Sequence, residues 1–269
     1  MTAPLQAIIF DVDGTLADTE RDGHRPAFNA AFADVGLDWE WSVPLYGELL
    51  RVTGGKERIH EYLRRFRPDF VPPPKSGSES ASPSLDAFVR ELHRRKTEHY
   101  VAMMRDGVIP LRSGVLRLLR EARDAGVRLA IATTTTPENV TALLASAPEP
   151  GLEHWFEVIA AGDVVPAKKP APDIFQLALA QLDLPPAACA AVEDSDNGVR
   201  SALGADLRAL LVTVSSYTEQ QDFTGAALVV DRLGEPDAPS TALAGTLQGF
   251  PHISLDALRA MHRRAYSMP

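Results

Sequence analysis

Two aspartates stand close together near the start of the chain, directly after a short apolar run. Residues 5–10 are followed by Asp11 and Asp13, and Gly14 comes next. Burying a carboxylate without a partner is costly, so we expect both aspartates where a buried strand leaves its sheet. Residues two apart in a strand share a side, and Gly14 permits a sharp turn. The pair therefore predicts a site of carboxylate chemistry, for which a plain Asp-Gly turn is the alternative.

Polar residues also follow three later apolar runs. In chain order they are Thr133 to Thr136, Lys168 and Lys169, and Glu193 to Ser195. In an open parallel sheet the carboxyl ends of the strands share one crevice, so these groups should converge with the two aspartates. Each group alone has a plainer role, because the threonines or the acidic group can cap a helix and the lysines can form a solvated turn. Their joint order, each at a strand end, favours one common site.

The chemistry of the converging groups is that of phosphoryl transfer. Asp11, Asp13, Glu193 and Asp194 bring like charges together, which favours a cation between them. Oxygen ligands without nearby His or Cys suit Mg²⁺ better than zinc. Threonine and lysine donors together with Mg²⁺ are what a phosphoryl group requires. One aspartate can then attack phosphorus as a nucleophile, while a second carboxylic acid donates and accepts protons.

Alternating strand and helix patterns explain how these groups are positioned. From about residue 111 onward, strand-length apolar runs alternate with helical patterns, which indicates a parallel α/β sheet of the Rossmann type. Strands are expected at residues 5–10, 127–132, 156–160, 189–192, 207–212 and 226–230. Helices are expected at residues 113–126 with Ser113 as the cap, 137–147, 172–182, 195–203 and 255–266. Residues 234–251 are expected to form a loop.

A long helical segment separates the first strand from the rest of the sheet. Residues 18–106 contain four amphipathic helical patterns and no strand pattern, and residues 72–84 are typical of a surface loop. Because connections this long are usually functional, we expect a cap domain of residues 18–106. The α/β core would then consist of residues 1–17 together with residues 107–269. We expect the cap to hinge at its two connections, where Gly107 is permissive.

Composition indicates a soluble globular protein and argues against two classes of partner. The 269 residues are 45% apolar and 23% charged, which is ordinary for a globular protein. No apolar run is long enough for a membrane span or a signal peptide, and the single Cys189 fits a reducing compartment. A net charge of −9 argues against nucleic acid or an anionic membrane as partner. We therefore expect a cytoplasmic protein. A monomer is the expected state, although no pattern in the sequence determines it.

With these motifs the chain resembles the haloacid dehalogenase superfamily of phosphohydrolases. The four motifs are Asp11-Val12-Asp13-Gly14-Thr15, Thr133, Lys169-Pro170 with Pro172-Asp173, and Glu193-Asp194-Ser195 with Asn197-Gly198. Four ordered motifs across residues 5–230 are far more specific than any one of them. The helical insertion directly after the first motif is similar to the first cap type (C1) of this family.

The resemblance implies a role for each matched acid. Asp11 would be the nucleophile that forms an aspartyl-phosphate, and Asp13 would be the general acid and base. Mg²⁺ would be held by Asp11, by the backbone carbonyl of Asp13 and by Asp194, with Glu193 nearby. The acid at Asp13 also argues against true dehalogenases and phosphonate hydrolases, which usually lack it.

The hydrogen-bond donors and cations of the site fall into two groups, each of which could bind one phosphate. The resemblance implies that Thr133 and Lys169 hold the phosphoryl group, and Thr134 is a further candidate for binding substrate. In the helical insertion, a second anion site is predicted at the start of a helix, where amides are flanked by two cations. Its residues are Arg51, Gly54, Gly55 and Lys56. A glycine turn with solvated charges is the alternative, whereas a second anion site implies a bisphosphate.

Residues 46–58 also resemble the CbbY-type branch of the family, which is associated with carbon fixation. That branch dephosphorylates xylulose 1,5-bisphosphate to xylulose 5-phosphate. The resemblance implies that Glu20, His24 and Tyr46 bind substrate hydroxyls, and a solvated helix histidine is the alternative for His24. A sugar phosphate is therefore the expected partner. Two other functions stay open, a phosphomutase of the β-phosphoglucomutase kind and a sugar-phosphate binding protein without catalysis.

Overall fold

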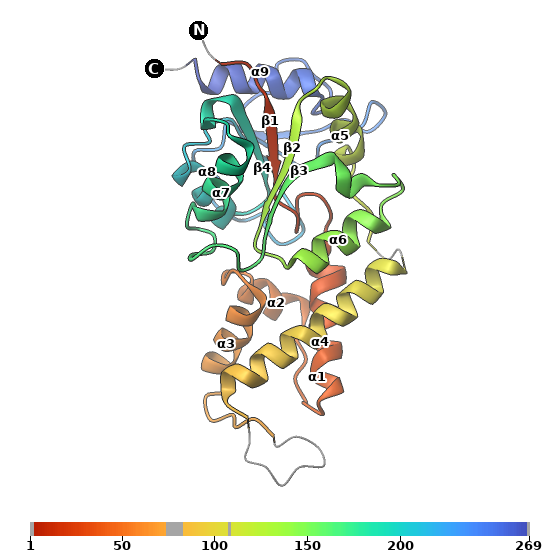
Figure 1. Cartoon of the computed structure of the whole chain (residues 1–269), viewed down its shortest axis with the longest axis vertical. Coiled ribbons are helices and arrows are strands. Elements are labelled where there is room, and N and C mark those ends of the chain that lie inside the picture. The colour runs from red at the N-terminus through yellow and green to blue at the C-terminus, as the bar shows by residue number, and fades with distance from the viewer. Residues whose placement is uncertain (1–2, 74–82, 107–108, 268–269) are drawn as a thin grey trace.

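A sheet with helices on both faces forms the larger part of the molecule (Figure 1). The computed structural model describes residues 3–73, 83–106 and 109–267. Within these residues the strand order is β3-β2-β1-β4-β5-β6-β7, with β7 antiparallel to β6 and all other pairs parallel. The strands are β1 (Ala7–Phe10), β2 (Arg128–Thr133), β3 (Phe156–Ala161), β4 (Cys189–Glu193), β5 (Leu210–Thr213), β6 (Leu228–Val230) and β7 (Ala242–Ala244). The predicted parallel α/β fold is confirmed.

The central strand β1 shows how the two faces of the sheet are covered. Ile8 and Phe10 pack into one apolar cluster with residues of α5, α6 and α9, while Ala7 and Ile9 pack into a second cluster with residues of α7 and α8. This is the alternation expected of a strand buried on both sides. The helices around the sheet are α5 (Val115–Asp124), α6 (Pro137–Ser146), α7 (Asp173–Leu182), α8 (Asp196–Gly204) and α9 (Leu255–Ala265).

Two details of the predicted elements are wrong. Ser113 does not cap α5, because Gly114 stands at the N-cap position and its amide donates to Glu235 Oε1 at 2.9 Å. A side chain is excluded at Gly114, since a Cβ would lie 2.4 Å from the carbonyl oxygen of Gly234. The region 234–251 is also not entirely loop, because β7 lies within it. This strand is only three residues long and largely exposed, so its sequence carries no clear alternation.

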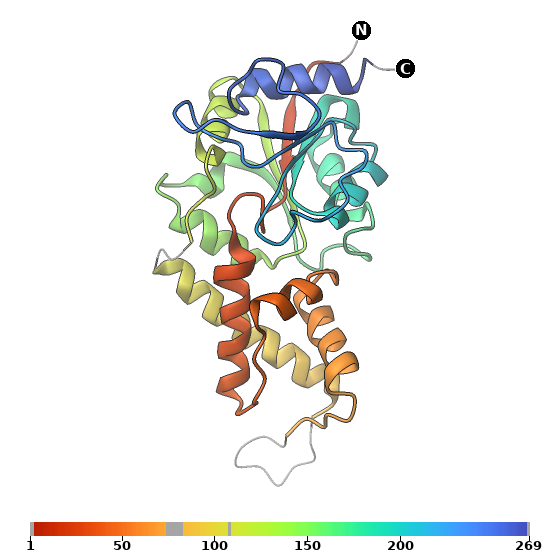
Figure 2. The same cartoon turned by 180° about the vertical axis from the view of Figure 1, so that it is seen from behind.

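The four predicted helices of the insertion lie beyond the carboxyl ends of the strands (Figures 1 and 2). They are α1 (Arg25–Asp34), α2 (Val43–Leu49), α3 (Gly55–Phe66) and α4 (Leu85–Arg105), with a π-helical turn at Glu20–His24 before α1. We call them the helical module. The module has its own core of aromatic and aliphatic side chains, which include Phe28, Phe32, Trp39, Trp41, Tyr46, Leu49, Ile59, Tyr62, Phe88 and Leu92. The domain boundaries at residues 18 and 106 stay a prediction.

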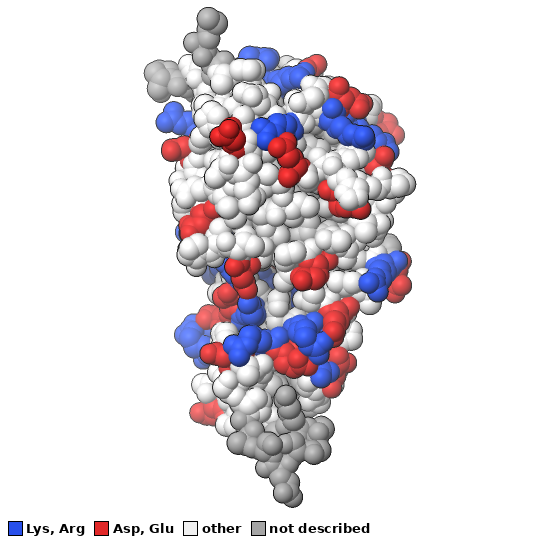
Figure 3. Space-filling model, in the orientation of Figure 1, with Lys and Arg blue, Asp and Glu red and all other residues white. Residues whose placement is uncertain are grey.

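Residues 74–82 of the predicted surface loop and the hinge residue Gly107 lie outside the described residues. On the visible face of the helical module, Lys and Arg stand next to Asp and Glu (Figure 3), in keeping with ion pairs such as Arg94–Glu91 and Arg95–Glu91 on α4. None of the helices in the described ranges is both long and apolar enough to cross a membrane.

Candidate active site

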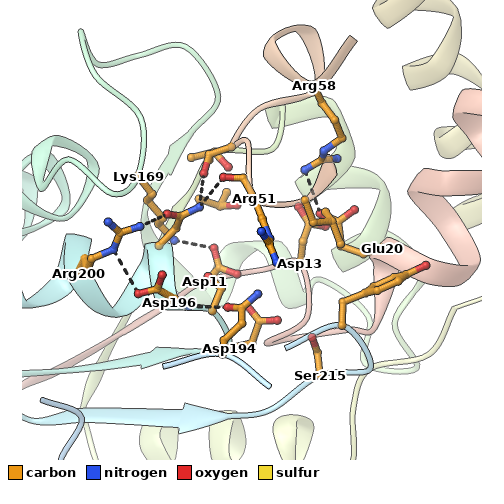
Figure 4. Close-up of a pocket in the computed structure, with 18 residues that line it drawn as sticks. Asp11, Asp13, Glu20, Arg51, Arg58, Lys169, Asp194, Asp196, Arg200 and Ser215 are labelled. Carbon is orange, nitrogen blue, oxygen red and sulfur yellow. Dashed lines mark hydrogen bonds and ion pairs between the residues drawn. The ribbon is translucent and has the colours of Figure 1, made fainter. Parts of the chain in front are cut away.

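A cavity of about 370 Å³ opens where the strand ends face the helical module. Eight of the predicted site residues line it, namely Asp11, Asp13, Glu20, Arg51, Thr133, Thr134, Lys169 and Asp194. Figure 4 shows the side chains of Asp11, Asp13, Lys169 and Asp194 converging with those of Glu20 and Arg51 from the module. The loop after β1 continues the sheet for one residue, because the amide of Asp11 donates to the carbonyl of Val192 at 2.9 Å. The sheet thus fixes the two aspartates at the cavity floor.

Lys169 joins two carboxylates at the bottom of this cavity. Its Nζ atom donates to Asp11 Oδ1 at 2.7 Å and to Glu193 Oε1 at 2.5 Å, and all three side chains are buried. Burial would lower the pKa of Lys169, but the two carboxylates hold it above its usual range. The neighbouring Lys168 turns away and pairs with Glu57 and Asp163, each at 2.8 Å. The lysine directly before the proline is therefore the one that reaches Asp11.

Three buried carboxylates form a cluster that suits a divalent cation. Asp11, Glu193 and Asp194 each bring one oxygen within 4.8 Å of the others. Burial and mutual repulsion raise the pKa of Asp11 to about 8 and that of Asp194 well above its usual range. An oxygen-only ligand set with more negative charge than Lys169 neutralises fits Mg²⁺. The residues present therefore fit the predicted metal.

Two glycines make room for these carboxylates. A Cβ on Gly14 would lie 2.0 Å from Asp194 Oδ2, and a Cβ on Gly198 would lie 1.9 Å from Glu193 Oε2. Gly14 also has a φ of +91°, a conformation that side-chain-bearing residues rarely adopt. Ser195 takes the capping role that was the alternative for its motif, since its hydroxyl accepts from the Gly198 amide at 3.2 Å. Helix capping and carboxylate placement thus occur in the same turn.

Asp13 takes part in a different network from Asp11. Its Oδ1 accepts from Thr19 Oγ1 at 2.5 Å and from His24 Nε2 at 2.9 Å. Burial would raise the pKa of Asp13, but His24 and Thr19 together hold it well below its usual range. His24 is only 3% exposed, so a solvated histidine is wrong. On the other side of the ring, Lys96 Nζ lies 2.8 Å from His24 Nδ1, and a donating ammonium there leaves the ring proton on Nε2 for Asp13.

Glu20 is held by two buried partners from the helical module. The hydroxyl of Tyr46 donates to Glu20 Oε2, and Arg58 Nη1 donates to the same hydroxyl at 2.8 Å. Arg58 Nη2 lies 3.7 Å from Glu20 Oε1. Tyr46 is completely buried and lines neither this cavity nor the smaller one beside it, so its direct contact with substrate stays a prediction. Tyr46 lies behind Glu20 and orients it.

A second cavity, of about 50 Å³, shares Asp13, Glu20, Arg58 and Thr134 with the first. The other predicted residues that line it are His24, Gly54, Gly55 and Lys56. Arg51 lines only the larger cavity, so the predicted single anion site is divided between two cavities. The reason lies at Gly54, whose φ of +99° turns the chain just before α3 begins.

The second cavity is rich in charge. Lys56 pairs with Asp163, and Lys168 pairs with Asp163 and Glu57. A Cβ on Gly54 would lie 2.2 Å from Glu57 Oε2 and 2.8 Å from Lys168 Nζ, so glycine is required for these groups to approach the loop. Within the described residues, buried Asn139 Oδ1 and Thr136 Oγ1 have no hydrogen-bond partner, and both residues line this cavity. The cavity is therefore suited to a polar ligand.

Several residues of the site were not predicted as site residues from the sequence. Arg58 and Lys96 are buried cations of the helical module, and Asn197 and Arg200 on α8 line the larger cavity. The sequence does contain an indication that Lys96 is buried, because it lies between Leu92 and Tyr100 at the four-residue spacing of the apolar face of α4. Asn197 belongs to the fourth motif, but the motif alone assigns it no contact.

Comparison with known proteins gives consistent matches. The sequence model of the haloacid dehalogenase-like hydrolases matches residues 5–206. Protein CbbY of Cereibacter sphaeroides is 47% identical over 231 residues, covering 86% of this chain and 94% of that protein. The plasmid-encoded protein CbbY of Cupriavidus necator H16 is 44% identical over 260 residues, covering 96% of this chain and 97% of that protein. The crystal structure of a CbbY variant from Rhodobacter sphaeroides in complex with xylulose-(1,5)bisphosphate has a TM-score of 0.74 at 46% identity, covering 85% of this chain and 94% of that one.

Proposed function

The chain belongs to the haloacid dehalogenase-like hydrolases and is a sugar-phosphate phosphatase similar to the CbbY proteins, and on this premise we propose that it hydrolyses xylulose 1,5-bisphosphate to xylulose 5-phosphate. One observation carries the choice of substrate. The cavity at Asp11 adjoins a second polar cavity, and the two share Glu20 and Arg58. A short sugar with a phosphate at each end suits such a pair of cavities.

The first chemical step uses Asp11. Its carboxylate attacks phosphorus, the bond from phosphorus to the sugar oxygen breaks, and that oxygen leaves with the electron pair and takes a proton from Asp13. Lys169 holds Asp11 in place at 2.7 Å, and Thr133 lines the cavity beside it as a donor to the phosphoryl oxygens. Mg²⁺, held by Asp11, Asp194 and the Asp13 carbonyl with Glu193 nearby, would supply positive charge against the phosphoryl oxygens.

The second step regenerates Asp11. A water molecule loses a proton to Asp13, its oxygen attacks phosphorus, and the bond between phosphorus and Asp11 breaks to release phosphate. The bonds from Thr19 and His24 keep Asp13 ionised, which suits this proton-accepting task. For the first step Asp13 must carry a proton, so those two bonds must loosen when substrate is present. The network around Asp13 thus couples its protonation to the helical module.

The helical module would act as a cap over residues 11–13, with boundaries at residues 18 and 106. In this arrangement Glu20 and His24 lie next to the sugar, and Gly54, Gly55 and Lys56 bind the second phosphate. Lys56 already lies beside the second cavity, and Asn139 and Thr136 there have polar atoms without partners among the described residues. Closure of such a cap would exclude bulk water during transfer.

A phosphate-release assay tests the proposal. We expect xylulose 1,5-bisphosphate to be preferred over sugar monophosphates, with activity lost in EDTA and restored by Mg²⁺. An equal rate on monophosphates and bisphosphates would refute the substrate, and activity retained in Asp11→Asn would refute the nucleophile. An isomerised product without free phosphate would indicate a mutase instead. Tight binding without turnover would indicate a binding protein.

A further inference from the structure

One side chain of α8 connects the sheet to the loop that carries Arg51. Asn197 Nδ2 donates to Thr53 Oγ1 at 3.0 Å and to the backbone carbonyl of Arg51 at 3.3 Å. On its other side, Asn197 Oδ1 accepts from Arg200 Nη2 at 2.6 Å. Both ends of the amide are therefore engaged, and its donor end points to the helical module. Such a bidirectional contact fixes the loop at residues 51–53 against the first turn of α8.

The loop fixed in this way carries a cation into the larger cavity. Arg51 lines that cavity together with Asp11, Thr133 and Lys169, and Figure 4 shows its guanidinium pointing toward the aspartates. Lys56, only five residues later, lines the other cavity. A guanidinium binds phosphate through two parallel donors and needs a defined orientation to do so. Its usefulness therefore depends on how the backbone at residue 51 is held.

We propose that Asn197 is a positioning residue that docks residues 51–53 on α8 and so places Arg51 on the phosphoryl group that is transferred. This inference rests on the proposed function and adds a division of labour to it. Arg51 serves the phosphate at Asp11, whereas Lys56 serves the second phosphate. Because Asn197 acts through the loop, its effect requires both its acceptor on Thr53 and the guanidinium of Arg51.

A double-mutant cycle tests the contact. Asn197→Ala and Thr53→Val each remove the 3.0 Å hydrogen bond, so each should lower kcat/KM by about three- to tenfold, the range of one hydrogen bond. The double variant should be no worse than the poorer single variant, and Thr53→Ser, which keeps the hydroxyl, should stay within about twofold of wild type. Penalties that multiply in the double variant would overturn the proposal.

Two further arms test whether the effect of Asn197 passes through Arg51 and reaches the transferred phosphate. In an Arg51→Gln background, Asn197→Ala should leave kcat/KM unchanged. In the wild-type background, Asn197→Ala should lower kcat/KM by the same factor for xylulose 1,5-bisphosphate and for xylulose 1-phosphate. A loss confined to the bisphosphate would assign Arg51 to the second phosphate and refute the proposal. The matched control is Ser216→Ala, which removes a hydrogen bond of 3.2 Å to Asp18 without touching this loop and should leave kcat/KM unchanged.

Binding of inorganic phosphate, measured by calorimetry, gives the same cycle without turnover. We expect Asn197→Ala and Thr53→Val each to weaken phosphate binding, and the double variant to bind no more weakly than the poorer single variant. Unchanged phosphate affinity in both single variants would overturn the proposal. If the wild-type protein bound phosphate but released none from xylulose 1,5-bisphosphate, the proposed substrate would be refuted. The phosphate-binding cycle would then still show whether Asn197 positions Arg51.

Discussion

Replacing Lys96 by Met should stabilise the fold and at the same time lower the activity. Lys96 lies on α4 with 3% of its surface exposed, and its ammonium contacts His24 Nδ1 at 2.8 Å. The same ammonium lies 5.1 Å from the ring centre of Tyr100 and 5.3 Å from that of Phe28. Burial among these rings lowers the pKa of Lys96 from 10.5 to about 8. The fold therefore maintains a cation at a position that disfavours it.

The pKa shift gives the size of the stability effect. At about 1.36 kcal/mol per pKa unit, a change from 10.5 to about 8 means that the charged form costs the folded state about 3 kcal/mol. Methionine has a similar length and no charge, and losing the bond to His24 offsets about 1 kcal/mol. We expect Lys96→Met to raise the free energy of unfolding by about 2 kcal/mol at pH 7.

The sign of the pH dependence follows from the direction of the shift. Between pH 8 and 10.5 the unfolded chain keeps a proton on Lys96 that the folded chain has lost, so wild-type stability gains from rising pH across this window. The advantage of the methionine variant should therefore be complete below pH 8 and disappear toward pH 10.5.

Activity should move in the opposite direction. Without the ammonium at Nδ1, only the Asp13 carboxylate favours a proton on His24 Nε2, so the ring is held by one partner instead of two and the bond of 2.9 Å to Asp13 is less firmly fixed. Loss of an outer partner that orients a metal ligand typically costs about 10- to 100-fold in activity, and we expect kcat/KM to fall by a similar factor for this partner of His24. The change should appear mainly in kcat, because Asp13 is the proposed proton donor and acceptor.

Urea unfolding in EDTA at pH 7 and pH 10, together with phosphate release, measures both effects. Arg95→Met is a matched control on the same helix, since Arg95 pairs with Glu91 at the surface and should change stability by less than about 1 kcal/mol. A Lys96→Met variant that is less stable than wild type at pH 7, or one that keeps full activity, would refute the reasoning.

Three further predictions concern the surroundings of the site. Gly198→Ala should cost about 1–3 kcal/mol of stability and weaken Mg²⁺ binding in calorimetry, because its Cβ would overlap Glu193 at 1.9 Å. Arg112→Met should lower the free energy of unfolding, and with it the urea midpoint, by about 1–3 kcal/mol for each buried acceptor left unsatisfied. The acceptors of Arg112 are the backbone carbonyls of Gly14, Thr213, Val214 and Asp231. Lys56→Met should lower kcat/KM for xylulose 1,5-bisphosphate about tenfold or more and leave xylulose 1-phosphate within about twofold, and equal losses on both substrates would contradict the assignment.

The floor of the site could be predicted because a parallel sheet imposes it. Asp11, Thr133, Lys169 and Asp194 lie far apart in sequence, yet each follows or ends a strand, and the carboxyl ends of parallel strands meet at one edge. Each residue type was therefore informative once its strand was recognised. The choice of Lys169 over Lys168 came from the family resemblance, and the structure places Lys169 against Asp11.

The second layer could not be predicted in the same way, because its partners are set by tertiary packing. Lys96 and His24 are 72 residues apart and meet only when α4 packs beside the turn before α1. Likewise, the helix start at Gly114 is capped by Glu235, which lies 121 residues away. Local patterns describe a lysine on a helix or a serine before one, but they contain no information on a distant partner.

The loop from Arg51 to Lys56 shows what a local pattern leaves undetermined about specificity. In sequence the two cations flank two glycines and resemble one anion site, but the turn at Gly54 directs them to different cavities. The backbone before the turn is held by Asn197 on α8, and the side chain of Lys56 after it pairs with Asp163 beyond β3. Each cation is thus set by a different part of the sheet. Under the proposed function the substrate engages both cations and must reach from one strand end to another, so the spacing of the strands, and not the loop alone, would select a molecule with two phosphates.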